Sequence, residues 1–501
     1  MKVILAGYNL DSEVIADLKR HAPARDDVTP ETLSASYARI SRDPRPVDEL
    51  RAAARQEVGK ARLSNQTIIF KMGHHSVAEH AVFNFDLIGL SRLALEEVEN
   101  FRLCSFTEKS QRYITLGGDF VIPEEIRRAG LEEVFLQTIR AQNALYHSLY
   151  ERLKPYVFDK HRDIAQNSNN RSVLDGWAKE DARYAVSLAT EGQLGMTINA
   201  RNLELLIRRF AAKKLAELRE LNAKIYALAK EVAPSIILFT ESGDFDSETY
   251  AGLKKAAQRL PRPEQKALAR PAGDRPAVRL VGYTPDGDDR ILAALIHTVS
   301  ALSYESCFDQ ARSMSRAEKS EFIKASLQHM EFYDFPLREF EHADLAFDLI
   351  VSAACFAQLK RHRMATLTRQ DYDPELGVTI PPSVEEIGAA GEFMAVIERT
   401  NDAYARLKKE VGEAANYILT NAHRRRVLLK LNVRELYHIS RLRQDPTAQW
   451  DIRRIAGMMA DEAGAVMPLS LMLLGGKDRF PQAYKRIFGK SPKYLPPDFL
   501  K

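Results

Sequence analysis

Residues 3–8 read Val-Ile-Leu-Ala-Gly-Tyr, and residues 278–283 repeat them as Val-Arg-Leu-Val-Gly-Tyr. Both segments are followed by a polar turn and then by apolar residues at helical spacing. Such a match between two halves of one chain is the sign of an internal repeat. It predicts two copies of one folding unit, each of which begins with a short strand.

Three further matches follow in the same order along both halves. The pairs are Glu79-His80-Ala81 with Glu341-His342-Ala343, Arg102 with Arg363, and Asn199-Ala200-Arg201 with Asn432-Val433-Arg434. Alternating apolar residues follow the first pair in both halves and predict a strand. Chance could supply one such match, but four in one order indicate a tandem duplication.

The two copies are separated by residues 241–276, which are rich in proline and lack sustained apolar periodicity. Such composition is typical of a linker or a surface excursion. We therefore predict one copy over residues 1–240 and a second over residues 277–501. Strand patterns mixed with long helical patterns, such as residues 199–232, predict an α+β fold with much helix. Two similar halves predict a fused dimer with pseudo-twofold symmetry.

Composition excludes several classes of protein. The chain has 501 residues, of which 45% are hydrophobic and 28% charged, so it is not mostly disordered. A net charge of +4 is too small to imply non-specific nucleic-acid binding. The apolar runs are shorter than the ~20 residues of a membrane span, and the N-terminus lacks a signal-peptide pattern. We expect a soluble cytoplasmic protein with neither a nucleic-acid nor a membrane partner.

The cysteines and histidines do not predict a metal site. Cys104, Cys307 and Cys355 are odd in number and far apart, which excludes a disulfide framework and a CxxC metal motif. In Gly73–His80, the spacing of the histidines and the glutamate fits neither zinc-protease signature. A helix start with a locally bonded histidine is the simpler interpretation, and we predict no metal.

Two other polar segments have two interpretations each. Residues 105–113 alternate polar and bulky side chains, which suits either a solvated edge strand or a loop that offers several donors to a phosphate. The cationic run Lys360–Arg363 is either a charged helix face or an anion site, because guanidinium groups bind phosphate through two hydrogen bonds. Neither a dinucleotide-binding glycine motif nor a P-loop is present.

Together these segments resemble the flavin-dependent thymidylate synthase family, whose signature is R-H-R-x-x-S-x-N-E-x-S-x-R. The resemblance covers most of both halves and excludes the linker. Its motifs are Gly73-His74-x-Ser76-x-x-Glu79-His80, Gly89-Leu90-Ser91-Arg92, Ser105-x-Thr107-Glu108-x-Ser110-Gln111-Arg112-Tyr113, Gln358-x-x-Arg361-His362-Arg363, Asn432-x-Arg434-x-x-x-His438, and Leu442-Arg443 leading to Ala448-Gln449-Trp450-Asp451.

Each half departs from the family pattern where the other half keeps it. The first half has Asn100-Phe101-Arg102 at the R-H-R position. The second half has Arg369, Asp371 and Asp373 at signature positions, and Asn416 where the first half has the substrate arginine Arg183. We therefore expect one composite site between the halves, whose pseudo-symmetric mate has decayed.

The resemblance implies an FAD-dependent thymidylate synthase that methylates dUMP to dTMP with methylenetetrahydrofolate and NAD(P)H. It implies that Arg443 is catalytic and holds negative charge on the uracil ring. The implied substrate-binding residues are Gln358, Arg361, Glu108, Ser110, Gln111, Arg112 and Arg183. The implied cofactor-binding residues are His74, Ser76, Glu108, Arg361, His362, Arg363, Asn199, Arg201, Asn432, Arg434 and His438.

The resemblance also implies how the chain assembles. Enzymes of this family are homotetramers whose sites are shared between neighbouring subunits, so we expect a homodimer of fused chains. Two other interpretations remain. One is a diverged flavin- or nucleotide-binding protein on the same scaffold, which the charges at Arg369, Asp371 and Asp373 favour. The other is a structural paralogue that binds no ligand.

Overall fold

The two copies form two separate sheets of identical strand order. The computed structural model describes residues 1–10, 12–21, 29–40, 43–72, 74–112, 114–260 and 276–497. The first sheet has the order β1-β2-β4-β3 and the second β5-β6-β8-β7, and every pairing is antiparallel. The strands are β1 (Lys2–Tyr8), β2 (Val82–Ser91), β3 (Ser105–Glu108), β4 (Glu191–Asn199), β5 (Val278–Tyr283), β6 (Asp344–Ser352), β7 (Thr366–Tyr372) and β8 (Arg424–Asn432).

The repeated hexapeptide forms the same irregular edge strand in both sheets. The register of β1 against β2 shifts between Leu5 and Gly7, and that of β5 against β6 shifts between Leu280 and Gly282. Such a bulge is a position where glycine is favoured in a strand. The glycine of each hexapeptide therefore marks the bulge, and the predicted duplication is confirmed at the level of register.

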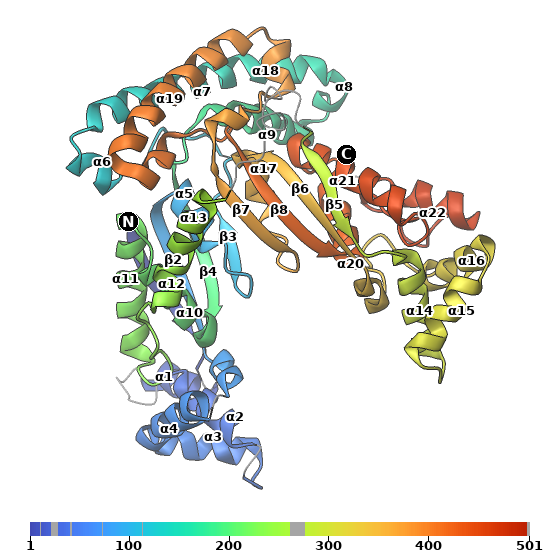
Figure 1. The fold of residues 1–501 in the computed structure, drawn as a ribbon. Coiled ribbons are helices and arrows are strands. Elements are labelled where there is room, and N and C mark those ends of the chain that lie inside the picture. The colour runs from blue at the N-terminus through green and yellow to red at the C-terminus, as the bar shows by residue number, and fades with distance from the viewer. Residues whose placement is uncertain are drawn as a thin grey trace.

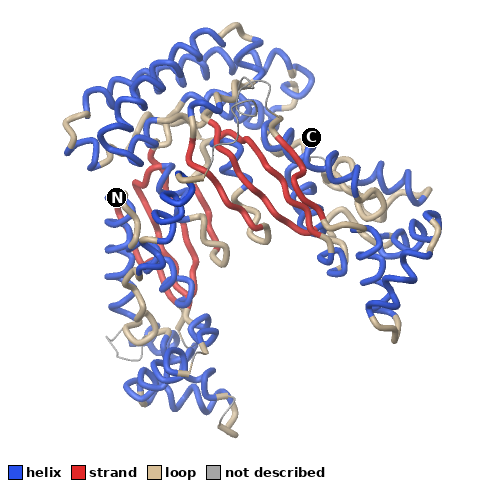
Figure 2. Tube along the Cα trace, in the orientation of Figure 1, coloured by secondary structure: helices blue, strands red, loops and turns tan. Residues whose placement is uncertain are grey.

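Each copy also has its own helices, which lie beside its sheet and across the top of the arch (Figures 1 and 2). Those of the first copy are α1 (Ser12–His21), α2 (Glu31–Arg39), α3 (Val47–Gln56), α4 (Val58–Asn65), η1 (Gln66–Lys71), η2 (His75–His80), α5 (Arg92–Val98), α6 (Glu124–Arg128), α7 (Glu132–Lys160), α8 (Arg162–Ala165), η3 (Ser168–Asn170), α9 (Arg171–Ala182), η4 (Arg183–Ala185), α10 (Ala200–Ala211) and α11 (Ala216–Val232). Those of the second are α14 (Gly287–Val299), α15 (Tyr304–Ser313), α16 (Arg316–Leu327), η7 (Arg338–His342), α17 (Ala353–Leu359), η8 (Pro374–Leu376), α18 (Pro382–Glu386), α19 (Ala390–Val411), η9 (Gly412–Ile418), α20 (Val433–Arg443), α21 (Trp450–Val466) and α22 (Phe480–Phe488). The predicted α+β class is confirmed.

The predicted linker contains helical structure that its composition did not indicate. Within residues 241–276, α12 (Asp244–Ser247) and α13 (Thr249–Gln258) are helical and bury no side chain. Residues 261–275 lie outside the described part of the chain. The exposure of α13 agrees with a surface excursion, and the boundaries at residues 240 and 277 stay a prediction.

The two halves share a hydrophobic core at the top of the arch in Figure 1, where α7 and α19 run side by side. Leu149 and Leu174 of the first copy and Phe393 and Ile397 of the second belong to one buried cluster. Each such side chain contributes roughly 1.5–3 kcal/mol when fully buried. This shared core holds the two sheets in a fixed relation to each other.

Backbone hydrogen bonds also cross between the halves. Ser187 forms an isolated antiparallel bridge with Thr420. These two residues stand the same number of positions before Asn199 and Asn432, so they are equivalent in the two copies. A contact between equivalent residues is the property of a twofold axis. The predicted pseudo-twofold arrangement is therefore present in the backbone. In the described part of the chain, every helix is too short or too polar to cross a membrane.

Candidate active site

The edge strand of the first sheet and the end of α17 meet where the halves face each other. Ser105–Glu108 pairs with β4, so the edge-strand interpretation is confirmed for these residues, and the chain leaves the sheet after Glu108. On the other side, Ser352 caps α17 by accepting a hydrogen bond from the Cys355 amide. That helix ends at Leu359, and the cationic run begins there.

One ion pair joins these two segments. Arg361 Nη2 donates to Glu108 Oε2 at 3.2 Å, and the Glu108 side chain is only 8% exposed whereas that of Arg361 is 50% exposed. Burial raises the pKa of Glu108, but the charges of Arg92, Lys360 and Arg361 outweigh it and hold that pKa below its usual value. Glu108 is therefore ionised, and its ion pair holds the half-exposed guanidinium of Arg361 in place.

Arginines from both halves surround the end of α20. Arg443, the last residue of that helix, has a pKa lowered to about 10 by burial and by the charges of Arg361 and Arg112. Arg112 reaches this place from the first copy: its Nη2 donates to the Thr447 carbonyl at 3.2 Å, and it forms an ion pair with Glu180. Like charges held this close favour a bound anion, because guanidinium groups pair well with phosphate.

A buried donor without a partner lies on the same side. Arg183 is 6% exposed, and among the described residues its Nη2 has no hydrogen-bond partner. Burial lowers the pKa of Arg183, and the positive charges of Arg112 and Arg92 lower it further against the opposing Glu180. A buried, unsatisfied donor costs ~1–3 kcal/mol. A ligand acceptor at this position would remove that cost.

Amide side chains complete the surroundings. Gln358 Nε2 donates to Gln449 Oε1 at 3.4 Å, and Gln449 Nε2 donates to the Tyr184 hydroxyl at 2.6 Å. Gln111 Oε1 accepts from Asn421 Nδ2 at 3.1 Å. A narrow cavity lies next to Glu108 and Gln111. Sequence reasoning assigned no role to Gln449, Asn421 and Thr447. For Gln449, the Ala-Gln-Trp-Asp motif was the available signal.

The predicted cofactor residues fall into two groups on different arms. His74 and Ser76 are exposed at η2, and Asn199 caps α10 by accepting from the Asn202 amide at 3.0 Å. In the other copy, Asn432 caps α20 in the same way, with the Glu435 amide at 2.8 Å. Figure 1 places α10 and α20 in separate arms. One chain does not bring these two groups together.

The arginines of the repeated Asn-x-Arg motif form equivalent ion pairs. Arg201 pairs with Glu79, and Arg434 pairs with Glu341, the residue that matches Glu79 in the repeat. Arg434 Nε also donates to the Pro336 carbonyl at 2.8 Å. These two arginines therefore hold α10 against η2 and α20 against η7 in the same way in both copies.

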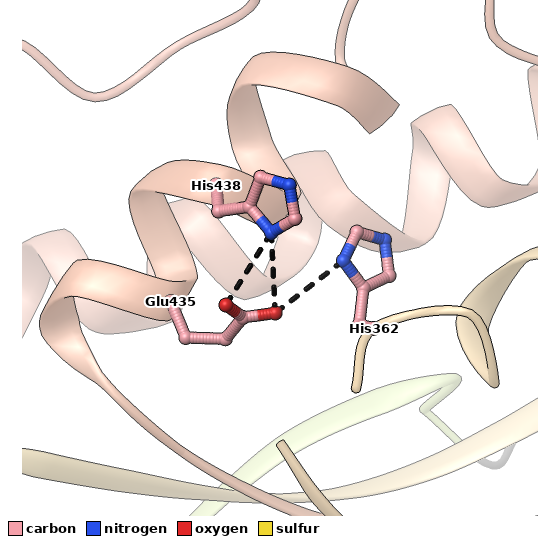
Figure 3. A group of neighbouring side chains, drawn as sticks. All are labelled: His362, Glu435 and His438. Carbon is pink, nitrogen blue, oxygen red and sulfur yellow. Dashed lines mark hydrogen bonds and ion pairs between the residues drawn. The ribbon is translucent and has the colours of Figure 1, made fainter. Parts of the chain in front are cut away.

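His362, Glu435 and His438 form a cluster at the start of α20 (Figure 3). Their ligand-type atoms lie within 4.8 Å of one another, so within the described residues this group has the spacing of a metal site, which the sequence analysis did not predict. His362 Nε2 accepts from Arg443 Nε at 2.9 Å. Burial lowers the pKa of His362 to about 4, helped by Arg443. Burial raises the pKa of Glu435, but its contacts with His362 and His438 lower that pKa to about 2.

Comparison with known proteins now settles the family. The model of the family described as thymidylate synthase complementing protein matches residues 26–235 and again residues 279–469. The chain belongs to this family. The two matched segments lie on either side of residues 241–276, so both copies carry the family's domain.

Some relatives match this chain over both copies, and others match it over one copy. A flavin-dependent thymidylate synthase of Geobacter sulfurreducens is 30% identical over 45% of this chain and 85% of its own length. A UPF0159 protein of Chlamydia muridarum is 25% identical over 79% of this chain and 77% of its own length. A solved UMP/dUMP methylase from Streptomyces cacaoi, bound with 5-Br dUMP, is 16% identical with a TM-score of 0.31 and covers 43% of this chain and 96% of its own.

Proposed function

We propose that this protein is a flavin-dependent thymidylate synthase, which converts dUMP to dTMP with methylenetetrahydrofolate and NAD(P)H in a composite site between its two halves. The observation that carries the proposal is that Arg112 of the first copy bonds to Thr447, just after α20, while Arg443 at the end of α20 bonds to His362, the neighbour of Arg361. Family membership supports the chemistry, since the flavin-dependent thymidylate synthase of Geobacter sulfurreducens matches over 85% of its own length and 45% of this chain.

The substrate side of the site is rich in donors for a nucleotide. Arg112, Arg183 and Arg361 would bind the phosphate, because guanidinium groups match its geometry. The buried, unpartnered Nη2 of Arg183 supports this role. Gln358 with Glu108, Ser110 and Gln111 would fix the sugar and the base, whose edges present both donors and acceptors.

Arg443 would be the catalytic residue. Addition at the uracil ring places negative charge on the base, and a fixed cation stabilises such charge most strongly where water is excluded. Arg443 is partly buried, and its pKa of about 10 keeps it protonated at neutral pH. Among the described residues, the hydrogen bond of Arg443 is made by Nε, to His362, and leaves Nη1 and Nη2 for a ligand. These two nitrogens would face the ring.

The residues also suit a flavin. The side chains of Arg361 and Arg363 are exposed cations, and His438, which is one-third exposed, contacts the ring of His362, which lies between them in sequence. This donor set fits the phosphates of FAD. FAD, once reduced by NAD(P)H, would supply the redox chemistry. His362, Asn432 and Arg434 stand on the same arm, with Glu108 opposite Arg361. His74, Ser76, Asn199 and Arg201 lie at η2 and α10, which pack together, and α10 stands in the other arm (Figure 1). They would reach the same flavin only from a second chain, as in the expected homodimer.

The cysteines are consistent with a route that needs no thiolate nucleophile. Burial raises the pKa of Cys104 to about 12 and that of Cys355 well above its usual value. Cys307 is completely buried. Cys104 and Cys355 are not suited to attack the base at neutral pH, because only the thiolate is nucleophilic, and burial keeps Cys307 from a ligand.

The test is release of tritium from dUMP labelled at C5, in the presence of methylenetetrahydrofolate, NADPH and the purified flavoprotein. The proposal expects release that depends on all three. No release under conditions that reduce the bound flavin would refute the synthase and leave a flavin- or nucleotide-binding protein. That second candidate is supported by Arg369, Asp371 and Asp373, which place charges at positions where the family signature has small polar groups.

A further inference from the structure

A chain of three side chains leads from the buried start of α20 to its end. Arg443 Nε donates to His362 Nε2 at 2.9 Å, and His362 Nδ1 lies 3.5 Å from Glu435 Oε1 (Figure 3). Glu435 and Arg443 belong to the same helix, and His362 stands in the segment that follows α17. Glu435 and His362 are 6% and 4% exposed.

The first hydrogen bond fixes the tautomer of the histidine. A guanidinium can only donate, so the Nε2 atom that faces it carries a lone pair and no proton. In a neutral imidazole the proton is then on Nδ1. Nδ1 is buried, and its contact across 3.5 Å is with the Glu435 carboxylate, which is an acceptor only. A carboxylate at this position favours the tautomer that Arg443 requires.

We propose that Glu435 and His362 are positioning residues for Arg443: the carboxylate holds His362 in its Nδ1–H form, and the free Nε2 fixes the guanidinium in one orientation. The bond occupies Nε and leaves Nη1 and Nη2 for the ligand. The proposal rests on the proposed function, because Arg443 is catalytic only there. It gives His362 a role different from the cofactor contact expected from the sequence, and the burial of the ring supports this change.

The same arrangement argues against a metal ion in this cluster. A cation bound at Nδ1 of His362 needs the lone pair of that atom and moves the proton to Nε2. Nε2–H and Arg443 Nε–H would then be two donors facing each other across 2.9 Å. A metal site and the observed bond of Arg443 exclude each other.

The test is a double-mutant cycle on dUMP affinity, measured by calorimetry at pH 7 for the wild type, His362→Leu, Arg443→Ala and the double variant. A hydrogen bond to a charged group predicts a loss of about 10- to 100-fold for His362→Leu in the wild-type background. Little further loss should occur once Arg443 is absent. An equal loss in both backgrounds would overturn the proposal, since a purely structural role does not depend on Arg443.

Three further variants keep the test sound. His362→Gln offers an acceptor oxygen near the position of Nε2 and should recover most of the affinity. Glu435→Gln keeps an acceptor for Nδ1–H and should be mild, whereas Glu435→Leu should show the same coupling to Arg443 as His362→Leu. Thermal unfolding of each variant identifies any that fail to fold, in which case the other member of the His362 and Glu435 pair carries the cycle.

Two readouts separate the possible failures. If the wild type releases tritium but His362 and Arg443 show no coupling, the positioning role alone is refuted. If the two residues are coupled but no tritium is released, the synthase activity alone is refuted. A wild type that does not bind dUMP would refute both. Equilibrium dialysis against Zn²⁺ tests whether the His362, Glu435 and His438 cluster binds a metal ion. Binding of one Zn²⁺ per chain that is lost in His438→Ala would overturn the tautomer argument.

Discussion

The proposed site and its pseudo-symmetric counterpart are built from equivalent positions with opposite outcomes. Glu108 pairs with Leu194 in the first sheet, and Arg369 pairs with Val427 at the same place in the second. Glu108 holds the half-exposed Arg361, whereas Arg369 forms an ion pair with the partly buried Glu97. The Glu108 position leaves the guanidinium of Arg361 half-exposed, whereas at the equivalent position the guanidinium of Arg369 is held in an ion pair inside the protein.

The counterpart is filled by its own charges. Glu96, which is 1% exposed, pairs with Arg425 and accepts from the Tyr372 hydroxyl at 2.8 Å. The guanidinium of Arg425 also lies 4.0 Å from the centre of the Tyr372 ring. Glu97 has a second cation in Lys213 at 2.7 Å. Arg183, by contrast, keeps a buried Nη2 without a partner among the described residues. The counterpart position is therefore a structural contact between the halves.

The largest expected effect is on stability, from breaking the filled position. Glu96→Ala leaves Arg425 and Arg92 buried without their carboxylate, and loss of one partner of a buried ion pair costs about 3–5 kcal/mol. Urea unfolding measures the loss. Glu392→Ala, which removes the exposed partner of Arg152, is the control and should cost at most about 1 kcal/mol. Equal costs would contradict the difference between the two positions.

The next effect is on turnover at the open position. Arg443→Ala removes the cation expected to hold charge on the base, and loss of one such group lowers kcat by about 10²–10³-fold. Arg112→Ala, in the opposite half, should also abolish useful turnover in the tritium-release assay. If either variant retained full turnover, the composite site would be refuted.

Co-assembly of the two inactive chains sharpens this comparison. When the site lies within one chain, mixed dimers of Arg443→Ala and Arg112→Ala chains contain no intact site and stay inactive. Recovery of activity on joint refolding would instead place the arginines of one site on two chains.

The third effect concerns acid stability. His362 and His423 both have pKa values lowered to about 4, by burial first, and are neutral in the folded protein. The unfolded chain takes up their protons near pH 6.5, so their contribution to stability is lost as the pH falls from about 6.5 to about 4. Asp181, with a pKa raised to about 7 mainly by burial, acts in the opposite sense. As the pH is lowered from about 6.5 to about 4, the urea midpoint of unfolding should fall less steeply for His423→Gln than for the wild type.

The smallest effect is expected from Arg102→Ala. Arg102 is the repeat equivalent of Arg363, but its Nε donates to the Arg363 carbonyl at 2.7 Å from an exposed position. Exposed substitutions of this kind change stability by about 0.5 kcal/mol or less. Turnover should remain close to that of the wild type, and a loss as large as that for Arg112→Ala would show that both positions bind ligand.

The repeat made much of the fold predictable. The hexapeptides and the Asn-x-Arg motifs mark equivalent strands and helix caps, so their alignment gives the two sheets and the pseudo-twofold arrangement. The helix α13 was missed because its ten residues bury nothing and show no apolar face against the rest of the chain.

The site was predictable by residue type but not by partner. Residue motifs indicated Arg112, Arg361 and Arg443, yet the bonds from Arg443 to His362 and from Arg112 to the Thr447 carbonyl depend on how the halves pack. The Arg369–Glu97 pair joins residues far apart in the sequence, so local pattern gave no signal for it.

The bridge between Ser187 and Thr420 has a consequence for synthesis of the protein. When the first copy leaves the ribosome, the backbone groups of Tyr184 and Leu188 that bond to the second copy have no partner, because the second copy has not yet been synthesised. At about 5–20 residues per second, these groups wait about ten to fifty seconds for their partners. During this interval a nascent first copy can pair with another first copy, since the two surfaces derive from one dimer. Correct assembly of this chain therefore depends on how fast the second half follows the first.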